Sequence, residues 1–105
     1  MQEVNEKDWK LFRSKVSIWQ ENYIDRLNKE YIELLSEDEN PSEKFWKLER
    51  RISKDKRNKG VILDMKRSSL MMNLVSLIRE EAIDLDDLDE FSDGLKESVN
   101  TIVTR

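Results

Sequence analysis

Large apolar residues recur at helical spacing through the first third of the chain, and this periodicity constrains the fold more than any other feature. They are Trp9, Phe12, Val16, Trp19, Tyr23, Leu27, Tyr31 and Leu34. Consecutive members are always three or four residues apart, which is the spacing of one face of an α-helix. The pattern predicts a long amphipathic helix from about Asn5 to about Leu35, with Asn5 as its N-cap and Asp8 as its partner in a capping box.

The expected length of this helix is large for so small a protein. Thirty helical residues span ~45 Å, whereas a compact chain of this length has a radius of gyration of only ~13 Å. One end of the helix should therefore protrude, and it must either bend or pack on a second molecule. Most of the stripe is expected in the core, and the overhang, around 23–34 or 9–16, is the expected contact surface. The candidate interface residues are Trp9, Phe12, Tyr23, Leu27, Tyr31 and Leu34.

The run Asn40-Pro41-Ser42-Glu43 predicts the start of a second helix. Asparagine is a good N-cap, proline suits the first helical position, and a glutamate at the third position completes a capping box. Phe45, Leu48 and Ile52 lie on one face of this helix, with Trp46 beside them. The second helix is therefore expected to be amphipathic.

Gly60 is placed as a stop or turn residue before a third helix, predicted over about 61–82. Seven of the nine residues from Leu70 to Ile78 are apolar, on every side of a helix. A helix that is apolar all round is usually interior, so this segment is expected at the centre of the fold. Asn73 and Ser76 would then need hydrogen-bond partners or an opening to face.

The last part of the chain predicts short C-terminal helices. Asp84 can cap a turn, Ser92 can cap a final helix, and the apolar positions that follow recur every three or four residues. These positions are Leu85, Leu88, Phe91, Leu95, Val99 and Ile102. With only two glycines and one proline, β and Rossmann-like folds fit poorly. We therefore predict a single all-α domain over 1–105, a small bundle of about four helices.

Composition removes several classes of chemistry. The chain has no cysteine and no histidine, which removes disulfides, thiolate metal sites, and the commonest general base and metal ligand. The calcium-loop pattern fails when it is started at Asp84, where Leu88 falls on a ligand position, or at Asp87, where Phe91 does. No nucleophile or phosphate-loop motif is present. We predict no enzymatic activity, no metal, no cofactor and no catalytic residue, and we expect a cytoplasmic protein because no signal or membrane-spanning segment is visible.

One stretch of the chain is strongly basic although the whole carries a net charge of −4. Residues 43–67 hold ten Lys/Arg and four Asp/Glu, whereas residues 79–97 hold two and nine. The stretch could bind a polyanion, bind a protein partner, pair with the acidic segment, or form a solvated surface. The candidate polyanion- or partner-binding residues are Arg50, Arg51, Lys54, Lys56, Arg57, Lys59, Lys66 and Arg67.

Two short patterns suggest a relationship to known proteins. They are Phe45-Trp46-x-Leu48-Glu49-x-Arg51-Ile52 and Asp86-Asp87-Leu88-x-x-Phe91-Ser92-Asp93-x-Leu95-Lys96-Glu97. Through these two patterns, the chain resembles a family of small, uncharacterised all-helical bacterial proteins. The resemblance implies a compact helical fold in a bacterial cytosol, and it transfers no activity and no site residue.

From the sequence we predict a non-enzymatic protein–protein interaction or regulatory module, with a homodimer among the expected assemblies. The alternative is a small nucleic-acid-associated regulator that uses the basic stretch 44–67. A membrane partner is not expected.

Overall fold

The computed structural model describes residues 4–105, and in that range it contains α-helices, two short 3-10 turns and no strand. The helices are α1 (Glu6–Leu35), α2 (Pro41–Asp55), α3 (Leu70–Arg79) and α4 (Asp93–Val103), and the 3-10 turns are η1 (Arg67–Ser69) and η2 (Leu85–Leu88). The predicted all-α fold of about four helices is confirmed.

Helix α1 begins at the position predicted for it. The Asn5 side chain accepts a hydrogen bond from the backbone N–H of Lys7 at 2.8 Å, so Asn5 is the N-cap. Asp8 has a different role from the predicted one. Its carboxylate is buried and accepts from the backbone N–H of Ser92 at 2.9 Å and from the Ser92 hydroxyl at 2.6 Å. Asp8 therefore joins the first turn of α1 to the start of α4 instead of closing a capping box.

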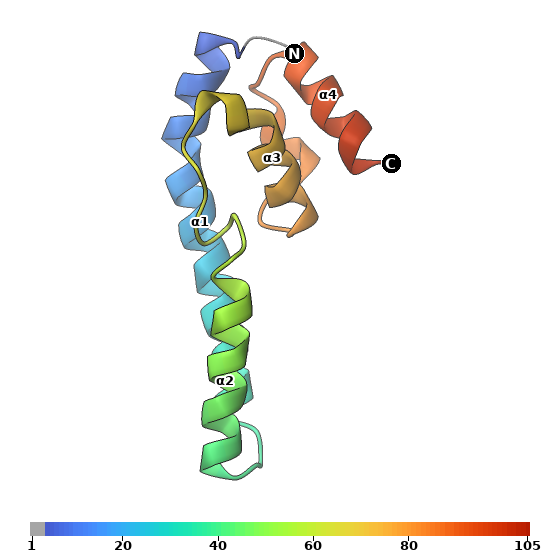
Figure 1. Ribbon diagram of the computed structural model, residues 1–105. Helices are drawn as coiled ribbons and strands as arrows, with labels where there is room; N and C mark the ends of the chain where they lie inside the picture. The colour runs from blue at the N-terminus through green and yellow to red at the C-terminus, as the bar shows by residue number, and fades with distance from the viewer. Residues whose placement is uncertain (1–3) are drawn as a thin grey trace.

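The N-terminal half of α1 packs against α3, η2 and α4, and we call this part of the molecule the head. Figure 1 shows α3 and α4 beside the upper half of α1. The central part of the core comes from α3, where Leu70, Leu74, Val75 and Leu77 are almost inaccessible to solvent. Each such side chain contributes about 1.5–3 kcal/mol by burial. The predicted interior position of 70–78 is confirmed for these residues.

The C-terminal half of α1 pairs with α2 in an antiparallel hairpin, which we call the arm. The two helices run side by side below the head (Figure 1). The molecule measures 52 × 25 × 21 Å, and its radius of gyration of 16.4 Å exceeds the ~13 Å of a compact chain of this length. Helix α1 does protrude from the head, but α2 doubles back along it and covers one side of the overhang.

The predicted third helix is too long by nine residues at its start, because α3 begins at Leu70. The segment before it is extended at Lys66, and the buried Asn73 side chain donates to the Asp64 carbonyl at 2.8 Å. That carbonyl is therefore held by a side chain and not by a helical N–H. The segment connects the arm to the head, and Leu63 packs against the core on the way.

The capping predictions have mixed outcomes. Asp84 caps η2 in a capping box with Asp87, and Ser92 caps α4 as predicted. Asn40 precedes α2 with Pro41 at the first turn, but its side chain makes no capping hydrogen bond, so that capping box was wrong. The chain enters α2 directly from the tight turn at 36–40, and Pro41 together with the acidic Glu43 in the first turn supplies the favourable start.

Candidate protein-interaction surface

The structure corrects the interface that the stripe predicted. Trp9, Phe12, Tyr23 and Leu27 are at most 7% exposed, so they are core side chains that a partner cannot reach. Tyr31 and Leu34 are half-buried on the arm. The overhang is real, but its apolar stripe faces α2.

One edge of the seam between α1 and α2 is polar. Arg51 Nη2 lies 3.0 Å from Glu30 Oε1, and Arg51 Nε lies 3.2 Å from the buried Asp55 carboxylate. Nearer the tip, Lys47 pairs with Glu39 and lies 3.9 Å from Glu37. The hydrogen bond from Lys47 lowers the pKa of the Glu39 carboxyl. This edge is closed by ion pairs.

Tyr31 spans the same seam. Its hydroxyl donates to Asp55 Oδ2 at 2.6 Å, and the Arg51 guanidinium lies 5.5 Å from its ring centroid. Burial and the hydrogen bond to Asp55 raise the pKa of the Tyr31 hydroxyl well above its ordinary value. The hydroxyl is therefore a fixed donor that gives the buried carboxylate of Asp55 a second partner besides Arg51.

The opposite edge of the seam is apolar. Successive helical residues project about 100° apart, so Ile52 and Phe45 lie about 140–160° round α2 from Lys47, and Leu48 lies between Arg51 and Ile52. On α1, Ile24 and Leu35 lie about 120–140° round the helix from Glu30, on that same side. We call this surface the apolar edge and define it by six residues. They are Ile24, Ile32 and Leu35 of α1 with Phe45, Leu48 and Ile52 of α2.

Much of the apolar edge is open to solvent. Phe45 is 61% exposed, Ile32 63%, Leu35 44% and Ile52 42%, while Ile24 and Leu48 are half-buried. The head packs on the side of α1 that carries Phe12, more than roughly 100° round the helix from Ile24 and Leu35. The head therefore leaves the apolar edge uncovered.

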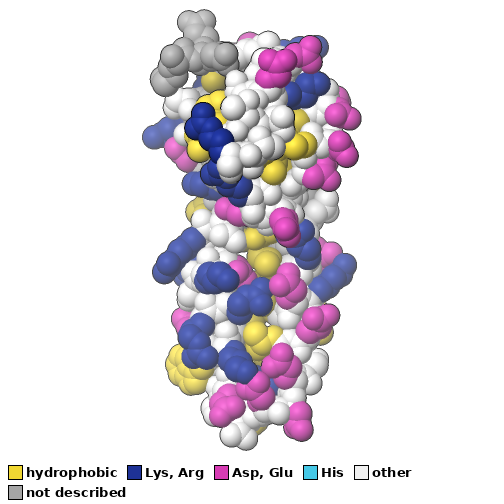
Figure 2. Space-filling model, turned by 90° about the vertical axis from the view of Figure 1, so that its right-hand side faces the viewer, with side chains coloured by type: hydrophobic (Ala, Val, Ile, Leu, Met, Phe, Trp, Pro, Cys, Tyr) yellow, Lys and Arg dark blue, Asp and Glu magenta, His cyan; other side chains and the backbone are white. Residues whose placement is uncertain are grey.

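The two limbs of the arm carry opposite charge. Residues 21–39 contain seven acidic and two basic residues, a net of −5, and residues 41–59 contain eight basic and three acidic residues, a net of +5. Figure 2 shows dark blue side chains collected mainly along one side of the lower half of the molecule and magenta ones along the other, with some yellow between them. The arm is thus electrically polarised across its width.

The predicted basic cluster is divided by the fold. Arg51 pairs with Glu30 and Asp55, Lys66 lies 3.8 Å from Asp64, and Arg67 lies 2.6 Å from Glu6. The remaining five members have no ion pair within 4–105, and they are Arg50, Lys54, Lys56, Arg57 and Lys59. At helical spacing, Arg50 and Lys54 fall on the outer face of α2, away from α1, and Arg57 lies just past the end of that helix.

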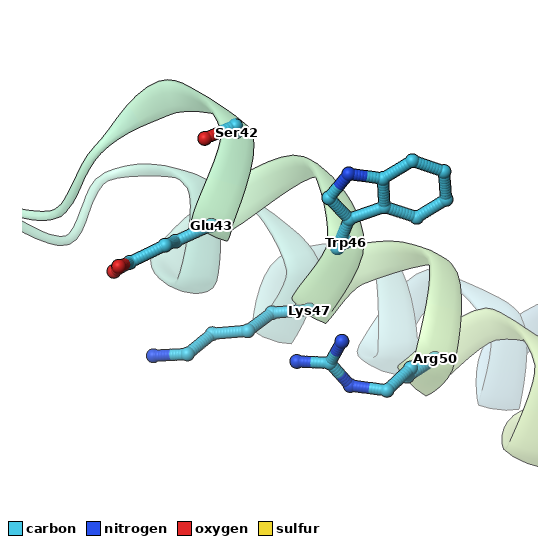
Figure 3. Close-up of a pocket in the computed structure, with 5 residues that line it drawn as sticks. All are labelled: Ser42, Glu43, Trp46, Lys47 and Arg50. Carbon is cyan, nitrogen blue, oxygen red and sulfur yellow. The ribbon is translucent and has the colours of Figure 1, made fainter.

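A shallow hollow of about 400 Å³ lies on this outer face near the tip of the arm. Its lining residues, Ser42, Glu43, Trp46, Lys47 and Arg50, all come from α2. Figure 3 shows the indole of Trp46 directed away from the Lys47 and Arg50 side chains, so no wall faces them across the hollow. Because Lys47 is already paired with Glu39, the hollow resembles an open helix surface and not a binding pocket.

A larger groove of about 980 Å³ lies on the head between the start of α1, α3 and α4. Its lining includes Met71, Met72 and Leu95, together with the hydrogen-bonded pair of Asp8 and Ser92. The Asn73 side chain is not available to a ligand in this groove, because its amide group already donates a hydrogen bond to the Asp64 carbonyl. Ser76 is half-buried on α3.

Neither a metal-binding cluster nor a membrane-spanning helix is present in the described part of the chain. Over 4–105, no group of three or more acidic residues is arranged to hold a metal ion. None of the helices in that same range is long and apolar enough to cross a membrane.

Comparison with protein-family models, with curated proteins and with solved structures found no match for this chain.

Proposed function

We propose that this protein is a non-enzymatic interaction or regulatory module that binds a protein partner through the apolar edge of its arm. The single observation that carries the proposal is the exposure of Phe45, Ile32, Leu35 and Ile52 on one side of one hairpin. Isolated exposed apolar residues are ordinary, but a contiguous group flanked by charge is typical of interaction sites. Phe45 at the tip supplies the aromatic anchor that such surfaces often use.

The fold also favours an arm used for contact. The buried core cluster lies in the head, and the arm nevertheless carries large apolar side chains on its outside. Burial of these side chains against a partner would recover about 25 cal/mol per Å² of apolar surface. A cytoplasmic location fits this role and stays a prediction.

The proposal is tested by capture from extracts of the native cells on immobilised protein. Three baits are compared: the unaltered chain, the double variant Phe45→Glu/Ile52→Glu, and Ile18→Glu. Ile18 is the matched control, because it is 61% exposed like Phe45 but lies in the N-terminal half of α1, beside the head and outside the arm. We expect the double variant to lose its partner by about tenfold or more, while Ile18→Glu retains it. Equal recovery on all three baits would refute the proposal.

The second candidate function is binding of a nucleic acid by the outer face of α2. Arg50 and Lys54 lie on that face and Arg57 lies just past its end, all three without an ion pair among the described residues, and the exposed Trp46 is available to stack on a base. Titration with DNA and RNA at two salt concentrations tests it. Binding that weakens steeply with salt and is lost in Arg50→Ala/Arg57→Ala would favour this candidate over the first.

A further inference from the structure

We propose that the partner seated on the apolar edge is a second copy of this chain, packed arm against arm with both hairpin tips pointing the same way. This inference rests on the proposed function and identifies the partner that binds the apolar edge. The product is a four-helix bundle built from two arms, with the two heads on the outside. Helices in such bundles lie ~8–10 Å apart, so the half-buried Ile24 and Leu48 would become interior.

Charge selects this arrangement. A twofold axis that runs along the arms places the acidic limb of one copy, net charge −5, opposite the basic limb of its partner, net charge +5. The same axis places the basic limb of the first copy opposite the acidic limb of the partner. A twofold axis across the arms would place each limb against its own like-charged equivalent. Opposed like charges are costly across an interface, whereas complementary limbs fix the orientation. The charge pattern of the arm is therefore complementary to itself. An unrelated partner would need its own pair of oppositely charged surfaces at the same spacing.

The geometry of the head permits the contact. The head packs on the Phe12 side of α1, and the apolar edge points elsewhere round the helix. Two arms can therefore approach through their apolar edges without collision between the heads. Self-association would cover Phe45 and Ile52, the most exposed apolar side chains of α2 on this edge.

One inter-copy charge pair follows from the register of the hairpin. The bonds from Gln20 Nε2 to the Lys59 carbonyl, 3.0 Å, and from the Tyr31 hydroxyl to Asp55, 2.6 Å, set the register of the two limbs. Asp25 and Lys56 accordingly lie at similar heights, both exposed and both on the side of the apolar edge. In the parallel arrangement Asp25 of one copy lies opposite Lys56 of the partner subunit, and in the crossed-axis arrangement Asp25 lies against the acidic limb of the partner subunit.

Sedimentation over a wide concentration range, at low and at physiological salt, tests the inference. We expect a reversible dimer that weakens with salt, and a dissociation constant that rises about tenfold or more in Phe45→Glu/Ile52→Glu but not in Ile18→Glu. Asp25→Lys and Lys56→Glu should each weaken the dimer several-fold. The double exchange Asp25→Lys/Lys56→Glu should restore it, because the pair is re-formed with its signs reversed. Circular dichroism of each variant shows that the fold is kept.

Three results would overturn the inference. One is a strict monomer at all concentrations, a second is a dimer that tolerates the apolar-edge variant, and a third is a dimer strengthened by Asp25→Lys alone. The proposed function fails on a different observation, namely capture that ignores Phe45 and Ile52. A monomer that still captures another protein through those residues would refute self-association and support the broader proposal.

Discussion

At the scale of single residues, the fold depends on a few side chains that join distant parts of the chain. Glu80, directly after the last turn of the head helix α3, accepts from the backbone N–H groups of both Lys59 and Gly60, at 3.0 and 3.1 Å. Asn58 donates to the Tyr23 hydroxyl at 2.8 Å. These bonds hold the segment that leaves α2 against the middle of α1, where the arm meets the head.

Gly60 is required there by close packing. Its backbone has no positive φ, so the turn itself does not demand glycine, but a Cβ at this position would overlap the ring of the buried Tyr23. We predict that Gly60→Ala lowers the free energy of unfolding by about 1–3 kcal/mol, as overpacking does in other interiors. Urea denaturation followed by tryptophan fluorescence measures the change.

Gly94 provides the control for this prediction. It lies in α4, and a Cβ added there would meet no atom within 4 Å, so Gly94→Ala should be neutral or stabilising by up to about 1 kcal/mol. Equal losses at both positions would show that the close approach to Tyr23 is not the reason for glycine at 60.

The local sequence pattern places Gly60 at a turn correctly but for the wrong reason. A glycine between two helices ordinarily indicates a left-handed terminus. The contact with Tyr23 joins residues far apart in the chain, and no local pattern contains it. The role of Asp8 was missed for the same reason, since its partner Ser92 lies 84 positions away.

At the scale of elements, periodicity located the helices, and tertiary contacts set their ends. The 30-residue α1 could be predicted because its stripe and its cap agree. The start of α3 could not, because 61–66 is apolar enough for a helix but must cross from the arm to the head as extended chain. The apolar edge was also missed. Phe45, Leu48 and Ile52 were recognised as one face of a helix, and such a face is ordinarily core.

The Tyr31–Asp55 hydrogen bond holds the two elements of the arm together, and it predicts a pH dependence. Tyr31→Phe leaves the buried Asp55 carboxylate with one partner fewer, so at neutral pH it should destabilise the protein by about 1–3 kcal/mol. The folded-state pKa of Tyr31 is raised above its ordinary value of 10.0. The protonated hydroxyl therefore stabilises the fold fully below that value and loses this contribution as the pH rises above it.

Denaturation of the two proteins at a series of pH values measures this effect. The difference in stability between the unaltered chain and Tyr31→Phe should be constant from pH ~7 to ~9 and shrink above pH ~10. A difference that stays constant well above pH ~10 would show that Tyr31 does not titrate differently in the folded state.

At the scale of the whole molecule, the shape explains how a long helix fits a short chain. A single compact globule could not cover α1, so the chain divides its apolar surface between a head with a real core and an arm with an exposed edge. The mismatch between helix length and domain size was predictable from the sequence. The sequence pattern assigned the uncovered surface to α1 alone, whereas the structure assigns it to α1 and α2 together.

Hydroxyl-radical footprinting of the protein, in extract of its native cells and in dilute purified solution, tests whether the apolar edge is covered by a partner. Labelling of Phe45, Ile52 and Leu35 should fall in the extract, while labelling of the comparably exposed Ile18 should not change. Unchanged labelling of the apolar edge, or protection of Ile18 to the same degree, would contradict the claim that this edge of the arm is the surface on which the protein acts.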